Sequence, residues 1–542
     1  MFKLILVFLL SFVLFFTSCE SYNNIEHIPS ISGTMVDNES WYSDANDDLL
    51  MMSIENPLPN EFTCKPHNDL DAPSRPCTLE DIYNDVNNSD LYEPTLHVRV
   101  ATDTFATSNT KINAVLKLKG NYSRTESQKS YSLKLDSKTD LLLNQRKFML
   151  TKSQSDQSRI KNKLAFDIFR TIPNISSLKV QFVHLQINDV DYGLFSQIES
   201  IRKEYLINRG WNEDDNLYNA VNFLFRRTPE ITLNTDGKPL SELEFSKVIE
   251  IKNGKQHTKL IEMIDAIAKT SNIDSVIAKY FNRENYITWL AINLVLNNKD
   301  TIQHNFYLYN PLYSDTFYFL PWDYDGAWSK EKYLGKDEYG ISNWWRSELH
   351  RKFLSIKKNR DDVYAMAEKL RNQYITDTFI QQKISEYEAT VRPFQSVVPD
   401  NFDNSDDTWL IKSERLWSSI PTNIAMYKSV IGHPMPFYVE AKYLDSLLSI
   451  TWDESVDLEG DSIVYDIVVS EDTNISNKTT NIIDVKDIQG TSYSLDINLT
   501  QGTYYIQVIS KEENNAQHYQ IAYEKTAIDD KILYGLLPFE VK

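Results

Sequence analysis

The strongest constraint on the fold of this chain is a change in its hydrophobic pattern near residue 436. Beyond that point, apolar-polar alternation occurs in Leu448–Trp452, Ile463–Ser470 and Thr503–Ile509. A two-residue period is typical of strands with one buried face, so residues 434–542 are predicted to form a small all-β sandwich. Before that point strands and helices are mixed, which predicts an α+β domain over residues 63–433, with a core at about 90–430.

Within the α+β region, several elements can be placed from local signals. Ser158–Arg170 and Tyr286–Val295 carry apolar residues at helical spacing, and an Asn-Asn pair ends the second helix. Asn188-Asp189 between two apolar runs predicts a hairpin. Two aromatic strands, Asn305–Tyr309 and Thr316–Leu320, are predicted after the second helix. Apart from its one helix, the stretch 90–200 is predicted to consist of strands, and residues 255–300 and 345–430 are predicted to be mainly helical.

Residues 1–18 have the pattern of an export signal. An uncharged apolar run, Leu4–Phe16, is too short to span a bilayer. The small residues before Cys19 resemble a bacterial lipoprotein box, which implies a lipid on Cys19 and a membrane-anchored, extracytoplasmic place in the cell envelope. An ordinary signal peptide and a short core helix are the alternatives. Residues 19–62 are polar and aperiodic, so they are predicted to form a flexible tether.

Composition narrows the class of protein further. The chain has 542 residues and a formal charge of −20, and 42% of its residues are hydrophobic. This apolar fraction excludes a wholly disordered chain, and the length suggests two to four domains. A surface this acidic repels phosphate backbones, so nucleic acid is not expected as a partner. Cys64 and Cys77 remain after Cys19, and in an exported protein they are either a disulfide or two free thiols.

The stretch that carries chemistry lies directly after the second helix. Asp300 is followed five residues later by Asn305, and Asp323 and Asp325 come after the aromatic strands. Phosphoryl transfer needs a carboxylate to orient an attacking hydroxyl, and Asn and Asp oxygens to hold Mg²⁺ against phosphates. The Asp-to-Asn spacing and the later Asp match the arrangement of the protein-kinase catalytic loop.

The N-terminal half supplies basic residues that could complement these acids. Gly120 lies in a turn after a strand. Lys129 lies just before the next predicted strand, Tyr131–Leu135, and Lys134 lies within it. A strand lysine is a suitable point charge for nucleotide phosphates, and Glu199 could pair with it. Taken singly, Lys129, Lys134 and Glu199 are better explained as solvated surface residues.

Together these motifs resemble the CotH kinase family, the atypical protein kinases that are similar to spore coat protein H. The resemblance covers roughly residues 90–430. The matching positions are Gly120, Asn121, Ser123, Lys129, Tyr131, Leu133 and Lys134, then Asp156, Ser158, Lys161 and Asn162, then Asn188, Tyr192, Gly193, Phe195 and Glu199, then Leu217 and Tyr218, and finally Asn298, Asp300, Asn305, Trp322, Asp323 and Asp325. Lys119 stands where the family pattern usually has Arg.

The resemblance implies a two-lobe, atypical kinase-like domain that transfers the γ-phosphoryl group of ATP to Ser or Thr hydroxyls of an unidentified protein, with Mg²⁺ or Mn²⁺. It implies Asp300 as the base, and Asn305, Asp323 and Asp325 as metal ligands. The implied nucleotide ligands and their supports are Gly120, Asn121, Ser123, Lys129, Lys134 and Glu199. The choice between the two lysines stays open at this point.

Two other functions remain as hypotheses. A non-catalytic, pseudokinase-like binding or adhesion lipoprotein would explain a kinase-like scaffold outside the cytoplasm, where ATP is scarce. Transfer of AMP in place of phosphate would use the same metal and lysine with the nucleotide reversed. The C-terminal sandwich resembles a fibronectin type III domain at Trp452-Asp453, Tyr465 and Gly502–Tyr505, which suggests a spacer or a binder of a glycan or protein.

Overall fold

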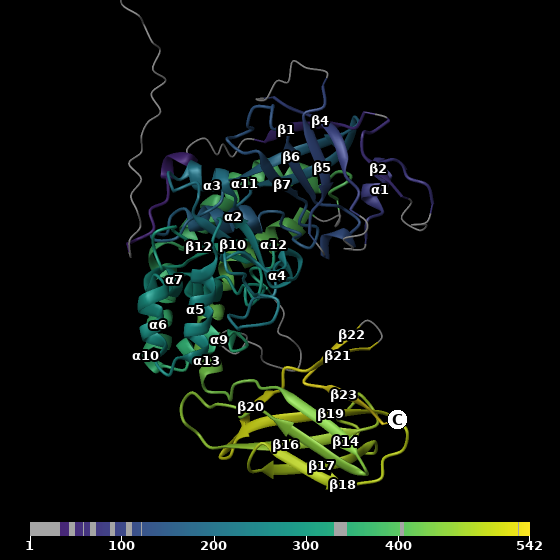
Figure 1. Ribbon diagram of the computed structural model, residues 1–542, viewed down its shortest axis with the longest axis vertical. Coiled ribbons are helices and arrows are strands. Elements are labelled where there is room, and N and C mark those ends of the chain that lie inside the picture. The colour runs from purple at the N-terminus through teal and green to yellow at the C-terminus, as the bar shows by residue number, and fades with distance from the viewer. Residues whose placement is uncertain are drawn as a thin grey trace, which may run out of the picture.

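The computed structural model describes residues 33–42, 49–57, 59–65, 72–86, 93–103, 111–120, 122–329, 344–401, 406–528 and 531–541. The predicted export signal, Cys19 and Asn121 lie outside the described residues. Three regions follow one another in Figure 1: a barrel, a mainly helical region and a C-terminal all-β region. The fold class is therefore α+β with a separate all-β end, as the change in hydrophobic pattern indicates.

The N-terminal region is a closed seven-stranded barrel in the order β1-β4-β5-β6-β7-β9-β8. Its strands are β1 (Leu50–Glu55), β4 (Leu96–Thr102), β5 (Ala114–Leu118), β6 (Tyr131–Leu135), β7 (Lys147–Thr151), β8 (Val180–Ile187) and β9 (Val190–Glu199). All neighbours are antiparallel except β1 and β8, which close the barrel in parallel. Alternate side chains of β4 and β5 point into one buried apolar core, because successive strand residues face opposite sides.

The segment before the barrel corrects the predicted tether. Trp41 and Tyr42, in the short helix Glu39–Tyr42, are buried, and Met35 donates its backbone N–H to Asn174 at 2.7 Å. Strand β1 pairs with both β4 and β8. A flexible tether over all of residues 19–62 is therefore wrong: at least residues 35–42 and 50–55 are part of the folded domain, because their apolar side chains complete its cores.

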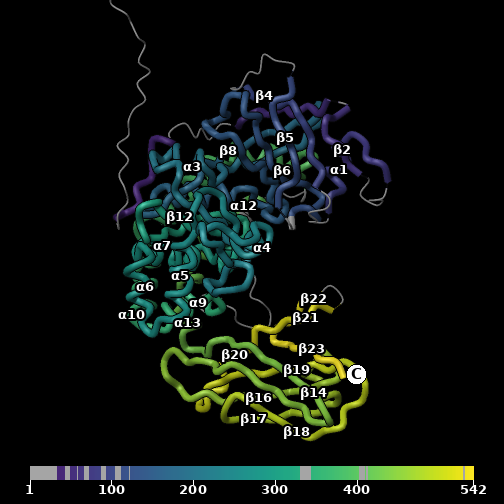
Figure 2. The backbone as a smooth tube through the Cα atoms, viewed as in Figure 1, coloured from purple at the N-terminus to yellow at the C-terminus, as the bar shows by residue number. Residues whose placement is uncertain are grey.

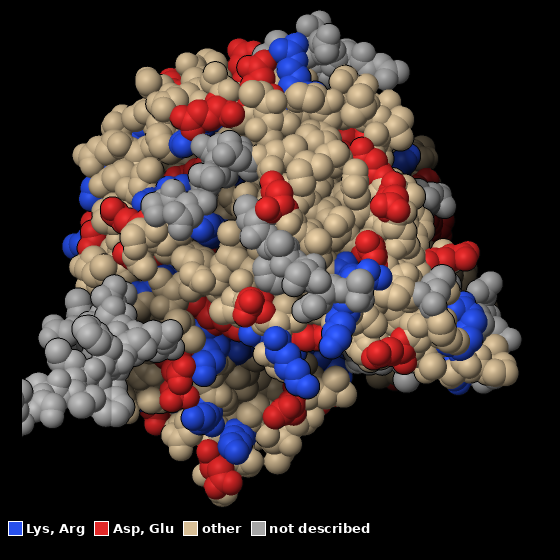
Figure 3. All heavy atoms as spheres, turned by 90° about the horizontal axis from the view of Figure 1, so that it is seen from above, with Lys and Arg blue, Asp and Glu red and all other residues tan. Residues whose placement is uncertain are grey.

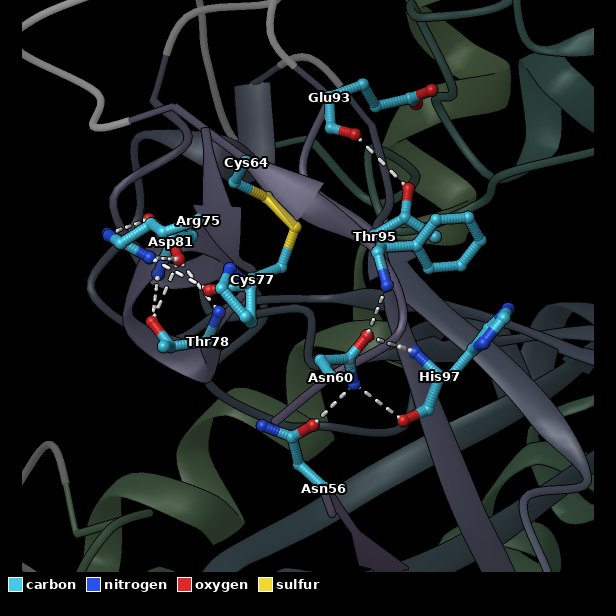
Figure 4. Close-up of a disulfide and its surroundings, with 12 residues drawn as sticks. Asn56, Asn60, Cys64, Arg75, Cys77, Thr78, Asp81, Glu93, Thr95 and His97 are labelled. Atoms are coloured by element: carbon cyan, nitrogen blue, oxygen red, sulfur yellow. Dashed lines mark hydrogen bonds and ion pairs between the residues drawn. A yellow bond between two sulfur atoms is a disulfide. The ribbon is translucent and has the colours of Figure 1, made fainter. Parts of the chain in front are cut away.

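The segment from Thr63 to Asp85, here called the disulfide-linked excursion, leaves the barrel between β1 and β4 and contains one disulfide. Cys64 and Cys77 form a disulfide with Cα atoms 4.9 Å apart, which selects the first of the two alternatives for these cysteines. The bond links β2 (Thr63–Cys64) and β3 (Arg75–Pro76) to α1 (Leu79–Tyr83). Helix α1 begins with a capping box between Thr78 and Asp81, and Asp81 also pairs with Arg75 at 2.7 Å (Figure 4). The excursion is thus held by one covalent and several polar contacts.

The helical region contains a four-stranded sheet in the order β11-β10-β12-β13. The strands are β10 (Asn216–Ala220), β11 (Ile249–Asn253), β12 (Phe306–Asn310) and β13 (Tyr318–Pro321). The helices are α2 (Lys161–Phe169), α3 (Lys203–Asn208), α4 (Glu242–Val248), α5 (Thr258–Lys269), α6 (Ile273–Tyr280), α7 (Arg283–Val295), α9 (Glu348–Leu354), α10 (Lys357–Gln373), α11 (Asp377–Gln395), α12 (Asp406–Ser418) and α13 (Ile420–Ile431). Helix α7 is buried on all sides from Asn285 onward and packs against β13, α10 and α13.

The C-terminal region is a sandwich of two sheets with one shared apolar core. One sheet contains β14 (Val439–Leu444), β15 (Leu447–Trp452) and β18 (Ser492–Asp496). The other contains β17 (Asn481–Ile488), β16 (Ile463–Ser470), β19 (Gly502–Glu512) and β20 (Asn515–Ile521), with β23 (Leu537–Val541) also on β19. A hairpin of β21 (Lys525–Ile528) and β22 (Lys531–Tyr534) extends from it (Figure 2). Arg360 of α10 donates to the Leu458 carbonyl at 3.0 Å, which joins the sandwich to the helices.

Two further features concern the surface charges and the apolar character of the helices. Figure 3 looks onto the barrel end of the molecule, where Lys and Arg side chains are interspersed with Asp and Glu. Among the described residues, no helix combines the length and the apolar character that crossing a bilayer requires.

Candidate functional site at the junction of barrel and helices

The loop that carries Asp300 follows α7 directly. The helix ends at Val295, and Asn297 takes a left-handed conformation with φ of 46°. The Asn298 side chain, which is buried, accepts the backbone N–H of Asp300 at 3.2 Å. The end of a buried helix therefore sets the direction in which the Asp300 backbone leaves it.

Both carboxylate oxygens of Asp300 accept a hydrogen bond from the same loop. Asn305 donates its Nδ2 to Oδ2 at 2.7 Å, and the His304 Nε2 lies 2.7 Å from Oδ1. Asn305 has a φ of 59°, a conformation that costs free energy in a non-glycine residue and that clusters at functional sites. Because the amide nitrogen faces Asp300, the amide oxygen of Asn305 is the atom left to bind a cation.

A second acidic loop follows β13 and packs against the first. Asp323 has a φ of 56°. A Cβ atom added to Gly326 would lie 3.2 Å from the Cβ of Asp300, so any larger residue would push the two loops slightly apart. The Tyr324 hydroxyl donates to Asn293 of α7 at 2.9 Å. The same helix thus anchors both acidic loops.

The start of α2 supports the second loop from the other side. Asn162 accepts the backbone N–H of Tyr324 at 2.8 Å, and the Lys161 Nζ lies 3.2 Å from the carbonyl oxygen of Asp325. Asp156 accepts the backbone N–H groups of Ser158 and Lys161, which positions the first turn of α2. The Asp-x-Ser and Lys-Asn residues of the sequence pattern therefore hold the Asp323–Asp325 loop in place.

The acids of the two loops, together with Asp156, influence one another electrostatically. Burial raises the pKa of Asp325 to about 7, helped by Asp323, Asp300 and Asp156, while the Lys119 ammonium opposes the rise. Like charges brought together disfavour ionisation in this way. The buried Oδ1 of Asp323 has no hydrogen-bond partner among the described residues. An unsatisfied carboxylate oxygen of this kind suits a hard divalent cation, which takes oxygen ligands. Among the described residues, the carboxylates of Asp300, Asp323 and Asp325 do not form a group whose ligand oxygens all lie within 4.8 Å of one another.

Lys119 is a site residue that motif matching left out of the candidates. Its Nζ donates to the Thr151 hydroxyl at 3.1 Å and lies 5.7 Å from the centre of the Trp322 ring. Its ammonium also acts on Asp325, where it opposes the rise in the pKa. The signal in the sequence was its place directly before the glycine turn, where the family pattern has another cation.

The two expected phosphate lysines lie elsewhere. Lys129 is buried, its Nζ donates to the Arg124 carbonyl, and it lies 5.2 Å from the centre of the Tyr83 ring. Burial lowers its pKa. Lys134 is exposed on β6, in register with Val115 and Lys147 of the neighbouring strands. Among the described residues, neither Lys129 nor Lys134 has a hydrogen bond or ion pair with the loops that carry Asp300, Asp323 and Asp325.

The expected pairing of Glu199 with either lysine is wrong. Glu199 is fully buried and forms two hydrogen bonds with the Arg209 guanidinium, each at 2.9 Å. Its Oε2 also accepts the Lys179 backbone N–H at 3.1 Å and the Trp41 indole N–H at 3.3 Å. A planar guanidinium matches a carboxylate in two places at once, which a lysine cannot do, and Arg209 was not visible as the partner from sequence spacing.

The glycine turn is formed as predicted, at the end of β5. Gly120 has a φ of 77°, and its carbonyl accepts the Arg124 Nε at 2.7 Å. The Ser123 hydroxyl donates to the Lys119 carbonyl at 2.7 Å. Arg124 in turn pairs with the buried Asp85, just after α1. The disulfide-linked excursion therefore contacts the turn that begins at Lys119.

A separate acidic cluster lies in the C-terminal sandwich. Asp457, Asp461 and Glu512 bring one ligand oxygen each within 4.8 Å of the others. Glu512 pairs with His518 at 2.7 Å, and Asp457 Oδ1 accepts three backbone N–H groups of its own loop. These contacts account for Asp457 Oδ1 and for Glu512, whereas the buried Oδ2 of Asp457 has no hydrogen-bond partner among the described residues.

The first site thus defines the class: an α+β protein with two acidic loops packed together where a barrel meets a helical region. A family model described as "CotH kinase protein" matches residues 116–425, which is more than half of the chain. The chain belongs to the CotH family.

One curated relative is similar over about half of the chain. It is the inner spore coat protein H of Bacillus subtilis (strain 168), 24% identical over 265 residues, which make up 48% of this chain and 71% of the relative. The matched family region contains the barrel from β5 onward, both acidic loops and the glycine turn, and it ends before the sandwich.

Proposed function

We propose that this chain is a protein kinase that transfers the γ-phosphoryl group of ATP to Ser or Thr hydroxyls of a protein acceptor, with Mg²⁺ or Mn²⁺. The observation that carries the proposal is the packing of the Asp300–Asn305 loop against the Asp323–Asp325 loop, the second of which holds an unpartnered carboxylate oxygen on Asp323. Membership of a family described as kinase supports it. Positioning and electrostatic stabilisation supply most of the catalysis of phosphoryl transfer.

Asp300 is the proposed base. Its carboxylate is half-exposed, and the two loop donors leave lone pairs that can accept the proton of an acceptor hydroxyl while the hydroxyl oxygen attacks the γ-phosphorus. Asn305, through its amide oxygen, and Asp323 and Asp325 are the proposed metal ligands. A cation bound there would neutralise charge on the β- and γ-phosphates.

Lys119 is the proposed phosphate cation, in place of Lys129 or Lys134. Its ammonium lies 5.7 Å from the Trp322 ring centre and opposes the rise in the pKa of Asp325, whereas the Nζ of Lys129 is bound to a backbone carbonyl and Lys134 is on the exposed face of β6. Gly120 and Ser123 would form the turn that covers the nucleotide. The barrel and the helical region would then act as the two lobes of a kinase-like fold.

The proposed location is the outer side of a bacterial membrane, with a lipid on Cys19. The sandwich, with its own core and its single short connection from α13, is compatible with a fibronectin type III-like spacer or a binder of protein or glycan. Transfer to proteins outside the cytoplasm would require ATP to reach that compartment.

The test uses purified residues 20–542 incubated with γ-labelled ATP and Mg²⁺ or Mn²⁺, followed by measurement of label on protein. Asp323→Ala is expected to lose at least about 10³-fold in transfer, because the metal loses a charged ligand. Its melting temperature should stay unchanged or rise, since a buried like charge is removed. Asp461→Ala, an exposed acid of the sandwich, is the matched control and should keep parental activity.

The outcomes separate the competing functions. Label from γ-labelled ATP that is lost in Asp323→Ala supports a kinase, whereas label from α-labelled ATP alone would indicate AMP transfer. Absence of both labels, together with no metal-dependent nucleotide binding, would overturn the proposal in favour of a non-catalytic surface binding protein.

A further inference from the structure

His304 is a residue of the acidic loop that none of the proposed roles uses. Its Nε2 lies 2.7 Å from Oδ1 of Asp300, four residues earlier in the chain. The side chains are 38% and 49% exposed respectively, so this contact lies at the open edge of the site. Among the described residues, His304 has no other side-chain hydrogen bond, ion pair or ring contact. Packing in the core therefore does not account for its orientation.

The hydrogen bond has a geometric consequence for Asp300. The terminal torsion of an aspartate is soft, so one donor alone leaves the carboxylate plane free to rotate. Asn305 holds Oδ2 at 2.7 Å and His304 holds Oδ1 at 2.7 Å, so two donors on two different oxygens fix the plane. Acid-base groups must be held within small tolerances of the productive geometry to act efficiently.

We infer that His304 is a positioning residue, which orients the Asp300 carboxylate toward the acceptor hydroxyl by donating from Nε2. The functional part of this inference rests on the proposed kinase activity. In that reaction a bond forms between the acceptor oxygen and the γ-phosphorus, and the bond from the γ-phosphorus to the β–γ bridging oxygen breaks. The hydroxyl proton passes to Asp300, and His304 keeps its Nε2 proton throughout.

The contact adds little to folding, which separates positioning from a structural role. Exposed ion pairs four residues apart contribute weakly to stability. Removal of the imidazole should therefore leave the melting temperature within about one degree of the parent. It should also leave nucleotide binding intact, because the proposed phosphate and metal ligands are other residues.

The kinetic experiment compares His304→Ala and His304→Gln in the full exported chain, with ATP and Mg²⁺. In His304→Ala, kcat is expected to fall about 10- to 100-fold while KM for ATP stays within about twofold. Gln can place an amide N–H near Asp300, so His304→Gln should recover most of the lost kcat. An unchanged kcat in His304→Ala, or a Gln variant no better than the Ala variant, would overturn the inference.

A structural measurement keeps the inference separate from the proposed activity. Crystal structures of the parent chain and of His304→Ala report the orientation of the Asp300 carboxylate directly, even if neither protein transfers phosphate. A single orientation in the parent that becomes rotated or multiple in His304→Ala supports positioning. An identical, single orientation in both proteins rejects it, whatever the kinetics. Absence of transfer by the parent would reject the proposed function and leave this structural result to decide the positioning role.

Discussion

Asp300 and Glu199 are two acidic centres of one domain, and their surroundings differ in kind. Glu199 is fully buried, and both of its oxygens are bound by the Arg209 guanidinium. Asp300 is half-exposed and is bound by two neutral or weakly basic donors of its own loop. The Glu199 carboxylate has hydrogen-bond partners on both oxygens and no contact with solvent, whereas the Asp300 carboxylate keeps free lone pairs and is accessible to solvent.

This difference separates structural acids from chemical ones. A buried carboxylate that has a bidentate cation partner contributes to folding, because breaking the pair leaves an uncompensated charge. A carboxylate with spare acceptor capacity at an open edge can exchange a proton or bind a metal. The predictions that follow test that division, in order of decreasing effect.

The largest effect is expected at Glu199. Glu199→Gln should lower the free energy of unfolding by about 1.5–3 kcal/mol, because Arg209 would lose its charged bidentate partner and keep only Asp37, at 3.1 Å, as a counter-ion. Denaturant unfolding measures the change, and Glu388→Gln, which removes an exposed partner of Arg392, is the control with almost no effect. A stable Glu199→Gln variant that had lost ATP binding would instead return Glu199 to the nucleotide site and break the comparison.

A smaller effect is expected for the lysines. Lys119→Ala should weaken Mg²⁺-dependent binding of ATP about tenfold, since one charge contact to phosphate is lost. Lys134→Ala, on the exposed side of β6, should bind as the parent does. Calorimetric titration of the two variants checks both. The reverse ranking would show that the contacts of Lys119 with Thr151 and Trp322 are structural only.

The smallest effect is a pH dependence of stability at Asp325. Burial and neighbouring acids raise its pKa to about 7, so between about pH 4 and pH 7 the folded chain holds a proton that the unfolded chain has lost. The contribution of this group to stability therefore falls as the pH rises through that window. Asp325→Asn should raise the melting temperature by about 2–5 °C at pH 8 and much less at pH 4.

Calorimetric scans without added metal provide the measurement for Asp325→Asn. An equal gain at both pH values would mean that Asp325 does not share its surroundings with Asp323 and Asp300. Addition of Mg²⁺ at pH 8 should stabilise the parent more than the variant, because the cation takes the place of the missing proton.

Local sequence signals predicted the acidic half of the site well. The spacing from Asp300 to Asn305 lies within one loop, and their contact at 2.7 Å follows from residues that are neighbours in the chain. The two aromatic strands that lead to Asp323 were also predicted, although β12 begins one residue later than expected. Strand β7, Lys147–Thr151, was not among the predicted elements.

The basic half could not be predicted in the same way. Which lysine faces the acids depends on strand register and on the closure of the barrel, and a shift of one residue moves a side chain to the opposite face. The partner of Glu199 is Arg209, ten residues later at the C-terminal end of α3. Only the packing of α3 places its guanidinium against the Glu199 carboxylate. The disulfide, by contrast, was one of two alternatives that the cysteine count allowed.

The sequence by itself determined the change from α+β to all-β, the family, and the order of the acidic residues. These depend on hydrophobic period and on spacing within single loops, which are properties of neighbouring residues. Only the tertiary structure decided that β1 closes a barrel, that Lys119 lies beside Trp322 and acts on the pKa of Asp325, and that Glu199 binds Arg209. Those outcomes depend on strand register and on the packing of side chains, where burial and charge select among many locally equivalent partners.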